Sequence, residues 1–361
     1  YIMVNKNNSE DKIIGFPRGM SYYEHYPFWY GFFNSLGIKV VLSDKTTKQT
    51  VSKGAALVVT ETCLPIKIFV GHVVELLEAG VNRIFVPSIQ SIAPKIYNCS
   101  KIRGLPDLIR NVIKQDFELI EPTIDKSQKN QGFYQFLKES VECFGITDFD
   151  TIRNASKEGW KLYNNFQTMM RNGIEYKTAL KNALKGKIVL DSDDTDYPIS
   201  IALVAHGYDV LDDQASMKIF DKLKKMGVKV YSSLQLTDEQ KIEGLNALDQ
   251  KMYWANELDM TGTAGHYLKV NKIDGLITVN SFGCGPDSLM IEKIVRKAKE
   301  YGKPMLSLTI DEHTGEAGFI TRLEAFVDML YRKKRIFMRK SSQEKELSFV
   351  PETNICDNIH S

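Results

Sequence analysis

A chain of 361 residues with 43% hydrophobic and 25% charged residues has the composition of a globular protein of two or three domains, which excludes fibrous and disordered classes. The net charge of +2, without a basic stripe, argues against a nucleic-acid-binding protein. No apolar run reaches transmembrane length, and no signal-peptide segment follows Tyr1. We therefore expect no membrane association and a cytoplasmic protein whose five cysteines stay reduced.

Strand and helix signals alternate along residues 12–124, which we assign to a first α/β domain. After a strand at Ile13–Phe16, aromatic residues from Tyr22 to Phe33 fit a helix entered or kinked at Pro27. Such a stripe is typical of a core; shielding a cofactor or gripping a flat ligand is the alternative. The β-α-β order predicts a parallel sheet. The other predicted elements are strands at Ile38–Leu42, Ala56–Val59, Arg83–Val86 and Phe117–Ile120 and helices at Lys45–Lys53, 66–77 and 100–113.

Residues 125–195 lack strand signals and predict a helical connector between two domains. Cys143 lies here, beside the apolar Val141 and Phe144, and we expect it to be a small core residue. The predicted helices are Gly132–Phe144, Thr151–Arg171 and Ile174–Leu184.

Strand signals return in residues 196–340, which we assign to a second α/β domain. The whole chain is therefore predicted to be an α/β protein with two Rossmann-like parallel-sheet domains and a helical connector. Basic residues at 332–335 fit a solvated helix end or a docking site for an acidic electron-transfer partner. Residues 341–361, with Cys356, are predicted to be a disordered tail. The predicted strands are Ser200–Val204, Val228–Tyr231, Gly275–Val279 and Lys303–Thr309. The predicted helices are Ala215–Met226, Ala247–Met260, a helix that begins at His266, and Ile320–Tyr331.

Three cysteines share one predicted setting. Cys63, Cys99 and Cys284 each lie after a strand and before a helix, with Pro or Gly close by. Open α/β sheets bind ligands at this position, because backbone N–H groups converge there and the helix dipole favours a negative thiolate. We expect Asp287 to cap the helix after Cys284. Each cysteine taken alone also fits a buried thiol in a tight loop.

The cysteines are far apart in the sequence, at separations of 99 − 63 = 36 and 284 − 99 = 185 residues, unlike zinc knuckles or small ferredoxins. Ligands from two domains would converge on a cleft. Zinc with a fourth ligand and a [4Fe-4S] cluster with one open iron both fit three thiolates.

Several polar residues are candidates for the remaining position or for catalysis. Glu61 fits the fourth ligand position of the metal centre or a helix cap. Glu312 and His313, with Asp311, fit proton transfer, a fourth ligand or a simple loop before a helix. His72, on the helix after Cys63, fits a packing residue better than a ligand.

Short motifs along most of residues 12–335 together resemble an anaerobic family. The motifs are Gly15–Arg18, Tyr22–Pro27, Glu61–Pro65, Phe69–His72, Cys99 with Gly104–Asp107, Phe282–Asp287, Asp311–His313 and Thr321–Phe326. With these motifs the chain is similar to proteins related to the 2-hydroxyacyl-CoA dehydratase activators, or CoA-enzyme activases, and distantly similar to 2-hydroxyglutaryl-CoA dehydratase and benzoyl-CoA reductase subunits.

The resemblance implies a [4Fe-4S] cluster bound by Cys63, Cys99 and Cys284 and low-potential electron chemistry. In the related dehydratases an electron delivered by an ATP-driven activator allows a 2-hydroxyacyl-CoA to lose its hydroxyl group. This chain has no Walker-type loop and no coenzyme A motif, so an ATP-dependent activator or a ferredoxin- or flavodoxin-type donor would be a separate partner. An acyl-CoA or another small molecule would be the ligand.

Two classes of function therefore remain. The first is an iron–sulfur redox protein, either a dehydratase-like lyase or an electron-transfer component. The second is a non-redox metal-binding or regulatory protein, which holds zinc or captures a small ligand such as sulfide at an open iron.

Overall fold

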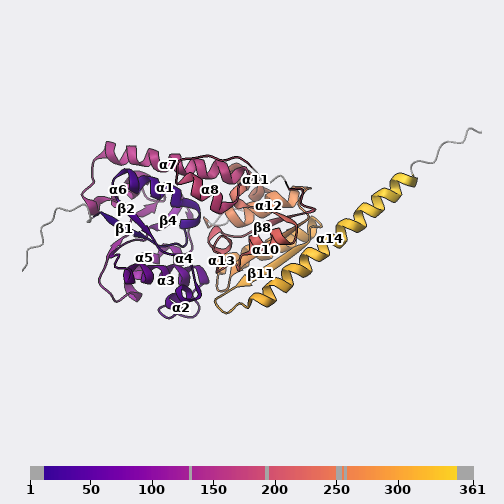
Figure 1. Ribbon diagram of the computed structural model, residues 1–361, viewed down its shortest axis with the longest axis horizontal. Helices are drawn as coiled ribbons and strands as arrows, with labels where there is room; N and C mark the ends of the chain where they lie inside the picture. Colours follow the sequence, from indigo (N-terminus) through magenta and orange to yellow (C-terminus); the bar gives the residue numbers. More distant parts are fainter. Residues whose placement is uncertain (1–11, 130–131, 192–194, 249–253, 256–257, 348–361) are drawn as a thin grey trace, which may run out of the picture.

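Two parallel four-stranded sheets lie at opposite ends of the molecule in the computed structural model, which describes residues 12–129, 132–191, 195–248, 254–255 and 258–347 (Figure 1). Their strand orders are β2-β1-β3-β6 and β11-β10-β8-β9, and every neighbouring pair is parallel. The predicted α/β fold with Rossmann-like domains is confirmed. The strands are β1 (Ile13–Phe16), β2 (Lys39–Leu42), β3 (Arg83–Phe85), β6 (Glu118–Ile120), β8 (Ile199–Val204), β9 (Val228–Ser232), β10 (Gly275–Ser281) and β11 (Met305–Ile310).

The aromatic stripe near the N-terminus forms a helix, α1 (Tyr22–Ser35), which continues through Pro27. Phe32 and Phe33 are fully buried, and the Trp29 ring lies 4.6 Å from the Phe85 ring of β3. The core interpretation of the stripe is therefore confirmed. The other helices of the first domain are α2 (Lys48–Ala55), α3 (Leu64–Glu78), α4 (Ser100–Arg103) and α5 (Leu105–Val112).

The predicted strand at Ala56–Val59 is wrong, because α2 ends at Ala55 and these residues form a turn that leads towards α3. Val59 is 70% exposed, unlike a residue in a central strand. A four-residue apolar run does not distinguish a buried strand from a helix end. The turn reverses the chain so that α2 and α3 cross closely at two glycines, Gly54 and Gly71.

A small third sheet, β5-β4-β7, was missed. Cys99 directly follows β5, and Tyr97 of this strand pairs with Trp254 of the second domain. This sheet therefore extends the first domain towards the second. Its strands are β4 (Ser88–Ala93), β5 (Ile96–Tyr97) and β7 (Thr123–Asp125).

The helical connector follows its prediction, and its long helix α7 passes over both domains (Figure 1). A Cβ atom on Gly159 would lie 2.7 Å from the Phe28 carbonyl oxygen, so α7 packs closely on α1. Cys143 is exposed in a 3₁₀ turn and is not the core residue that we expected, because its neighbour Val141 takes the buried position. The connector contains α6 (Phe133–Glu139), η2 (Glu142–Phe144), α7 (Phe149–Arg171) and α8 (Tyr176–Ala183).

Two predicted helices of the second domain need correction. Ala247 ends helix α11 instead of beginning the predicted helix Ala247–Met260, of which residues 249–253 and 256–257 lie outside the described residues. Helix α11 begins after Thr237, which forms a capping box with Gln240. The helix predicted from Ala215 begins only at Ile219, because Lys218 has a positive φ of 56°. The helical elements here are α9 (Gly207–Val210), α10 (Ile219–Lys225), η3 (Ser233–Gln235), α11 (Asp238–Ala247), a π-helix (Leu258–Gly262), α12 (Thr263–Lys269), α13 (Gly285–Glu300) and α14 (Glu316–Leu347).

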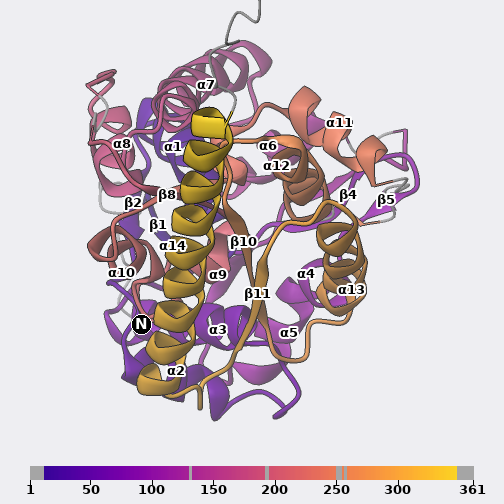
Figure 2. The ribbon, with the colours of Figure 1, turned by 90° about the vertical axis from the view of Figure 1, so that its right-hand side faces the viewer.

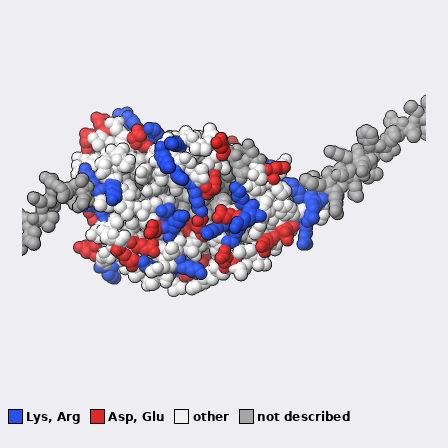
Figure 3. Space-filling view, viewed as in Figure 1, with Lys and Arg blue, Asp and Glu red and all other residues white. Residues whose placement is uncertain are grey.

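The last helix, α14, runs along one face of the second sheet and then projects beyond it (Figures 1 and 2). It takes in residues 341–347, which we expected to begin the disordered tail; residues 348–361, with Cys356, lie outside the described residues. Lysine and arginine side chains are interspersed with acidic ones on the face in Figure 3. Within the described ranges, every helix is too short or too polar to cross a lipid bilayer.

Candidate metal centre

The three candidate cysteines occupy equivalent local positions. Cys63, Cys99 and Cys284 are the N-cap residues of α3, α4 and α13, and each has an extended backbone conformation. None of the three side chains makes a regular capping hydrogen bond, although the Cys63 thiol interacts with the Ile66 N–H and the Cys284 thiol with Asp287. The predicted setting before a helix is confirmed for all three.

The structure brings these cysteines together from both domains. They line one pocket, whose apolar wall includes Met20, Ile66 and Ile102. The first domain contributes Cys63 and Cys99, and the second contributes Cys284 with Tyr208 and Asp209 of α9. Thiols that are distant in sequence therefore share one partly buried space.

Lys101 holds the cysteine-bearing segments together. It lies two residues after Cys99, and its Nζ donates to the carbonyl oxygens of Glu61, at 3.1 Å, and Gly283, at 3.3 Å. Gly283 has a φ of +76°, and a Cβ atom there would lie 2.9 Å from the Glu61 carbonyl oxygen. The loops before Cys63 and Cys284 thus approach so closely that a glycine is required.

The local electrostatics favour the protonated thiols of Cys63 and Cys284. Burial raises the pKa of Cys63 to about 11, although the Lys101 cation acts in the opposite direction. Burial, followed by the Asp287 carboxylate, raises the pKa of Cys284 above its usual range. A metal that binds these sulfurs would therefore displace protons.

A buried acid–base group behind Cys284 was missed in the sequence. His206 Nε2 lies 2.9 Å from Asp287 Oδ1, and both residues are almost completely buried. Burial lowers the pKa of His206, but the Asp287 carboxylate outweighs it and raises the pKa to about 9. Asp287 lies in the first turn of α13 and is not its cap, because Cys284 occupies the N-cap position. The sequence His206-Gly207-Tyr208-Asp209 after β8 was the available signal.

The weaker candidates lie outside this pocket. The Glu61 side chain is exposed, and its carbonyl oxygen binds Lys101. Glu312 forms an ion pair with the buried Lys67 of α3, at 2.5 Å between Oε1 and Nζ, which joins the two domains. The His313 side chain is 83% exposed. Asp311 accepts hydrogen bonds within its own loop, from the Thr314 hydroxyl and the His313 N–H.

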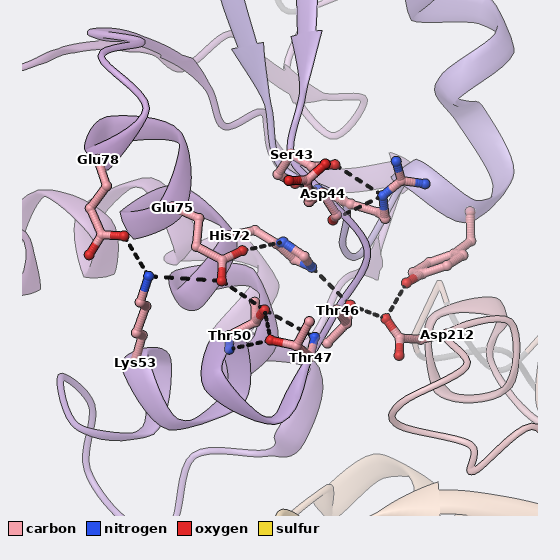
Figure 4. Close-up of polar contacts among 12 residues, drawn as sticks. Ser43, Asp44, Thr46, Thr47, Thr50, Lys53, His72, Glu75, Glu78 and Asp212 are labelled. Atoms are coloured by element: carbon pink, nitrogen blue, oxygen red, sulfur yellow. Dashed lines mark hydrogen bonds and ion pairs between the residues drawn. The ribbon is translucent and has the colours of Figure 1, made fainter.

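A second polar network joins the domains near the middle of α3 (Figure 4). Asp212 of the second domain accepts hydrogen bonds from the hydroxyls of Tyr23, at 2.6 Å, and Thr46. The Thr46 hydroxyl also lies 2.9 Å from Nε2 of His72. His72 is fully buried, and burial lowers its pKa to about 3, so it is neutral here. It is part of the contact between the domains and does not line the cysteine pocket.

Within the described residues, no three His, Cys, Asp or Glu side chains lie close enough to share a single metal ion. The three thiols therefore line one pocket but do not form a ready-made site for a single ion.

Comparisons with known proteins divide the chain in two overlapping parts. Residues 201–330, with Cys284, match the family model of the 2-hydroxyglutaryl-CoA dehydratase D-component. No curated protein matches the chain. Residues 13–235, more than half of the chain and including Cys63 and Cys99, match the family model described as the CoA enzyme activase uncharacterised domain. The chain therefore belongs to the CoA enzyme activase uncharacterised domain family.

Proposed function

We propose that this protein holds a [4Fe-4S] cluster between its domains through Cys63, Cys99 and Cys284 and acts in a 2-hydroxyacyl-CoA dehydration system. The observation that carries the proposal is the shared pocket, to which two domains bring three N-cap cysteines. The match to a dehydratase component supports the reaction class.

The donor set fits a cluster in three respects. Thiolates are the usual protein ligands of iron–sulfur clusters, and each binds a different iron, so the sulfurs need not converge on one point. The N-termini of α3 and α13 favour negative charge at the sulfurs. The Lys101 ammonium group, bound to the loops before Cys63 and Cys284, adds a cation next to an anionic centre.

A bound cluster would supply low-potential one-electron chemistry. The residues of the pocket would control its surroundings: Met20, Ile66 and Ile102 limit the access of water, and Lys101 stabilises negative charge. The electron would come from a separate protein, an ATP-dependent activator or a ferredoxin- or flavodoxin-type donor. The substrate would be an acyl-CoA.

Anaerobic reconstitution with iron and sulfide tests the proposal. The wild-type protein should become brown, bind iron and sulfide in equal amounts and give an electron paramagnetic resonance (EPR) signal after reduction. Cys284→Ala should prevent assembly of the four-iron cluster. Cys143→Ala is the matched control, because Cys143 is exposed outside the pocket, and it should behave like the wild type.

Two outcomes would contradict the proposal. A colourless protein that binds zinc would indicate the non-redox alternative. A chromophore that survives Cys284→Ala but is lost in Cys143→Ala would show that the ligands are assigned wrongly.

A further inference from the structure

Two carboxyl oxygens in the cysteine pocket, Oδ2 of Asp209 and Oδ2 of Asp287, are buried and make no hydrogen bond within the described residues. Asp209 of α9 is 1% exposed and lines the pocket together with the three cysteines. Its Oδ1 accepts a hydrogen bond of 2.6 Å from the Ser281 hydroxyl. Its Oδ2 is buried and makes no hydrogen bond with any residue of the described ranges. An unsatisfied buried acceptor destabilises the folded state, which suggests that a bound group satisfies it.

The charge of Asp209 also lacks a dedicated counterion. The cationic group that acts on Asp209 is His206, which already pairs with Asp287 at 2.9 Å. Burial raises the pKa of Asp209 to about 7, and His206 opposes this only in part. A cationic centre in the pocket would compensate an ionised Asp209.

The other acidic candidates do not reach this position. Glu61 and Glu312 do not line the pocket, and the Glu312 carboxylate is bound to Lys67. Asp287 also lines the pocket, but its Oδ1 is paired with His206, whereas Oδ1 of Asp209 accepts only from the neutral Ser281 hydroxyl. Of the two pocket carboxylates that have a buried oxygen without a hydrogen bond, Asp209 is therefore the one whose other oxygen is not paired with a cationic side chain.

If the iron–sulfur assignment above holds, we propose that Oδ2 of Asp209 coordinates the iron that the three cysteines leave without a protein ligand. Carboxylate oxygen is a hard ligand that iron accepts in proteins. The Ser281 hydroxyl donates a hydrogen bond to Oδ1 and would thereby fix the orientation of the Asp209 carboxylate. Metal ligands in proteins are commonly oriented by such hydrogen bonds. The carboxyl group would release its proton to solvent when it binds the metal.

The reduced, reconstituted full-length protein allows a direct test by electron–nuclear double resonance in water enriched with a magnetic oxygen isotope. The wild type should show no coupling between the cluster and the labelled water, because the carboxylate occupies the fourth position. Asp209→Ala should show this coupling, since water would enter the vacated position. Asp209→Cys should give Mössbauer spectra in which all irons have the same sulfur coordination.

The matched control is Glu61→Ala, which removes a carboxylate outside the pocket and should leave the wild-type spectra unchanged. Coupling to labelled water in the wild type would overturn the proposal even if the Asp209 variants did not fold, because solvent would then be the fourth ligand. The cluster assignment would survive that result. A wild-type protein without a four-iron cluster would instead refute the assignment itself, and the Asp209 proposal with it.

Discussion

The segments around Cys63 and Cys284 look alike in sequence but are built differently. Both cysteines are N-cap residues, and both are followed by a proline near the start of the helix, Pro65 or Pro286. Cys284 comes after β10, whose residues are all buried in the middle of a sheet. Cys63 instead follows a partly exposed turn after α2. The shared signature thus marks the beginning of a helix and does not require a preceding strand.

The two segments are consequently stabilised by different contacts. The Cys63 loop depends on the close crossing of α2 and α3 and on Lys67, which binds the Thr60 carbonyl oxygen and Glu312. The Cys284 loop depends on its buried strand and on the pair of His206 and Asp287. Substitutions that affect one set of contacts at a time can show how much each set contributes to stability.

The largest expected loss of stability comes from Gly71→Ala in α3. The new Cβ atom would lie 1.9 Å from the Thr50 carbonyl oxygen, so two helix backbones would have to separate. We expect unfolding free energy to fall by more than about 4 kcal/mol, measured by urea denaturation. Gly285→Ala in α13 is the matched control, because its Cβ meets nothing within 4 Å. A similar loss in both variants would contradict the explanation by helix crossing.

The next largest effect should come from His206→Ala, which leaves the buried Asp287 carboxylate without its partner. We expect a loss of about 3–5 kcal/mol in unfolding free energy. The double variant with Asp287→Ala should be more stable than His206→Ala alone, because no buried charge then remains unpaired. If the double variant were less stable than the single one, the pair would not be the cause.

The same pair predicts a pH dependence. The pKa of His206 is raised from 6.5 to about 9 in the folded protein. Its stabilising contribution is therefore complete below about pH 6.5 and is lost as the pH rises through about 9, on the order of 3 kcal/mol in total. Unfolding free energy measured across this range should decline in the wild type and less in His206→Gln. Parallel declines would show that another group titrates.

Lys67→Met should have a smaller effect on the Cys63 side. It removes a buried cation that binds Glu312 of the other domain, and we expect a loss of about 2 kcal/mol in unfolding free energy. Lys53→Met is the matched control, because Lys53 pairs with the more exposed Glu78 inside the first domain and should cost less than about 1 kcal/mol. Equal losses would mean that the domain-bridging pair has no special role.

Lys101→Met should have the smallest effect on folding, below about 1 kcal/mol, because the side chain is only partly buried. It should nevertheless lower the reduction potential of a reconstituted cluster, since a cation near the anionic centre is removed. Potentiometric EPR titration would measure this shift. An unchanged potential would show that Lys101 only joins the loops before Cys63 and Cys284.

Sequence patterns predicted the two sheets, the aromatic core helix and the position of the three cysteines before helices, because these depend on local periodicity. The patterns failed where tertiary contacts decide the structure. The run at Ala56–Val59 forms the turn that allows α2 and α3 to cross. His206, Asp209 and Asp287 could not be associated from sequence, because they approach only after two segments of the second domain pack together.

The long separation along the chain also affects how the site is made. Cys99 is synthesised 284 − 99 = 185 residues before Cys284, and Cys63 is synthesised 284 − 63 = 221 residues before it. At about 5–20 residues per second, the ribosome needs roughly 10–40 s to cover the shorter of these distances. During that time the first two thiols lack the part of the pocket wall that Cys284 provides. Protection of these thiols from oxidants during translation must therefore come from the cell and not from the finished fold.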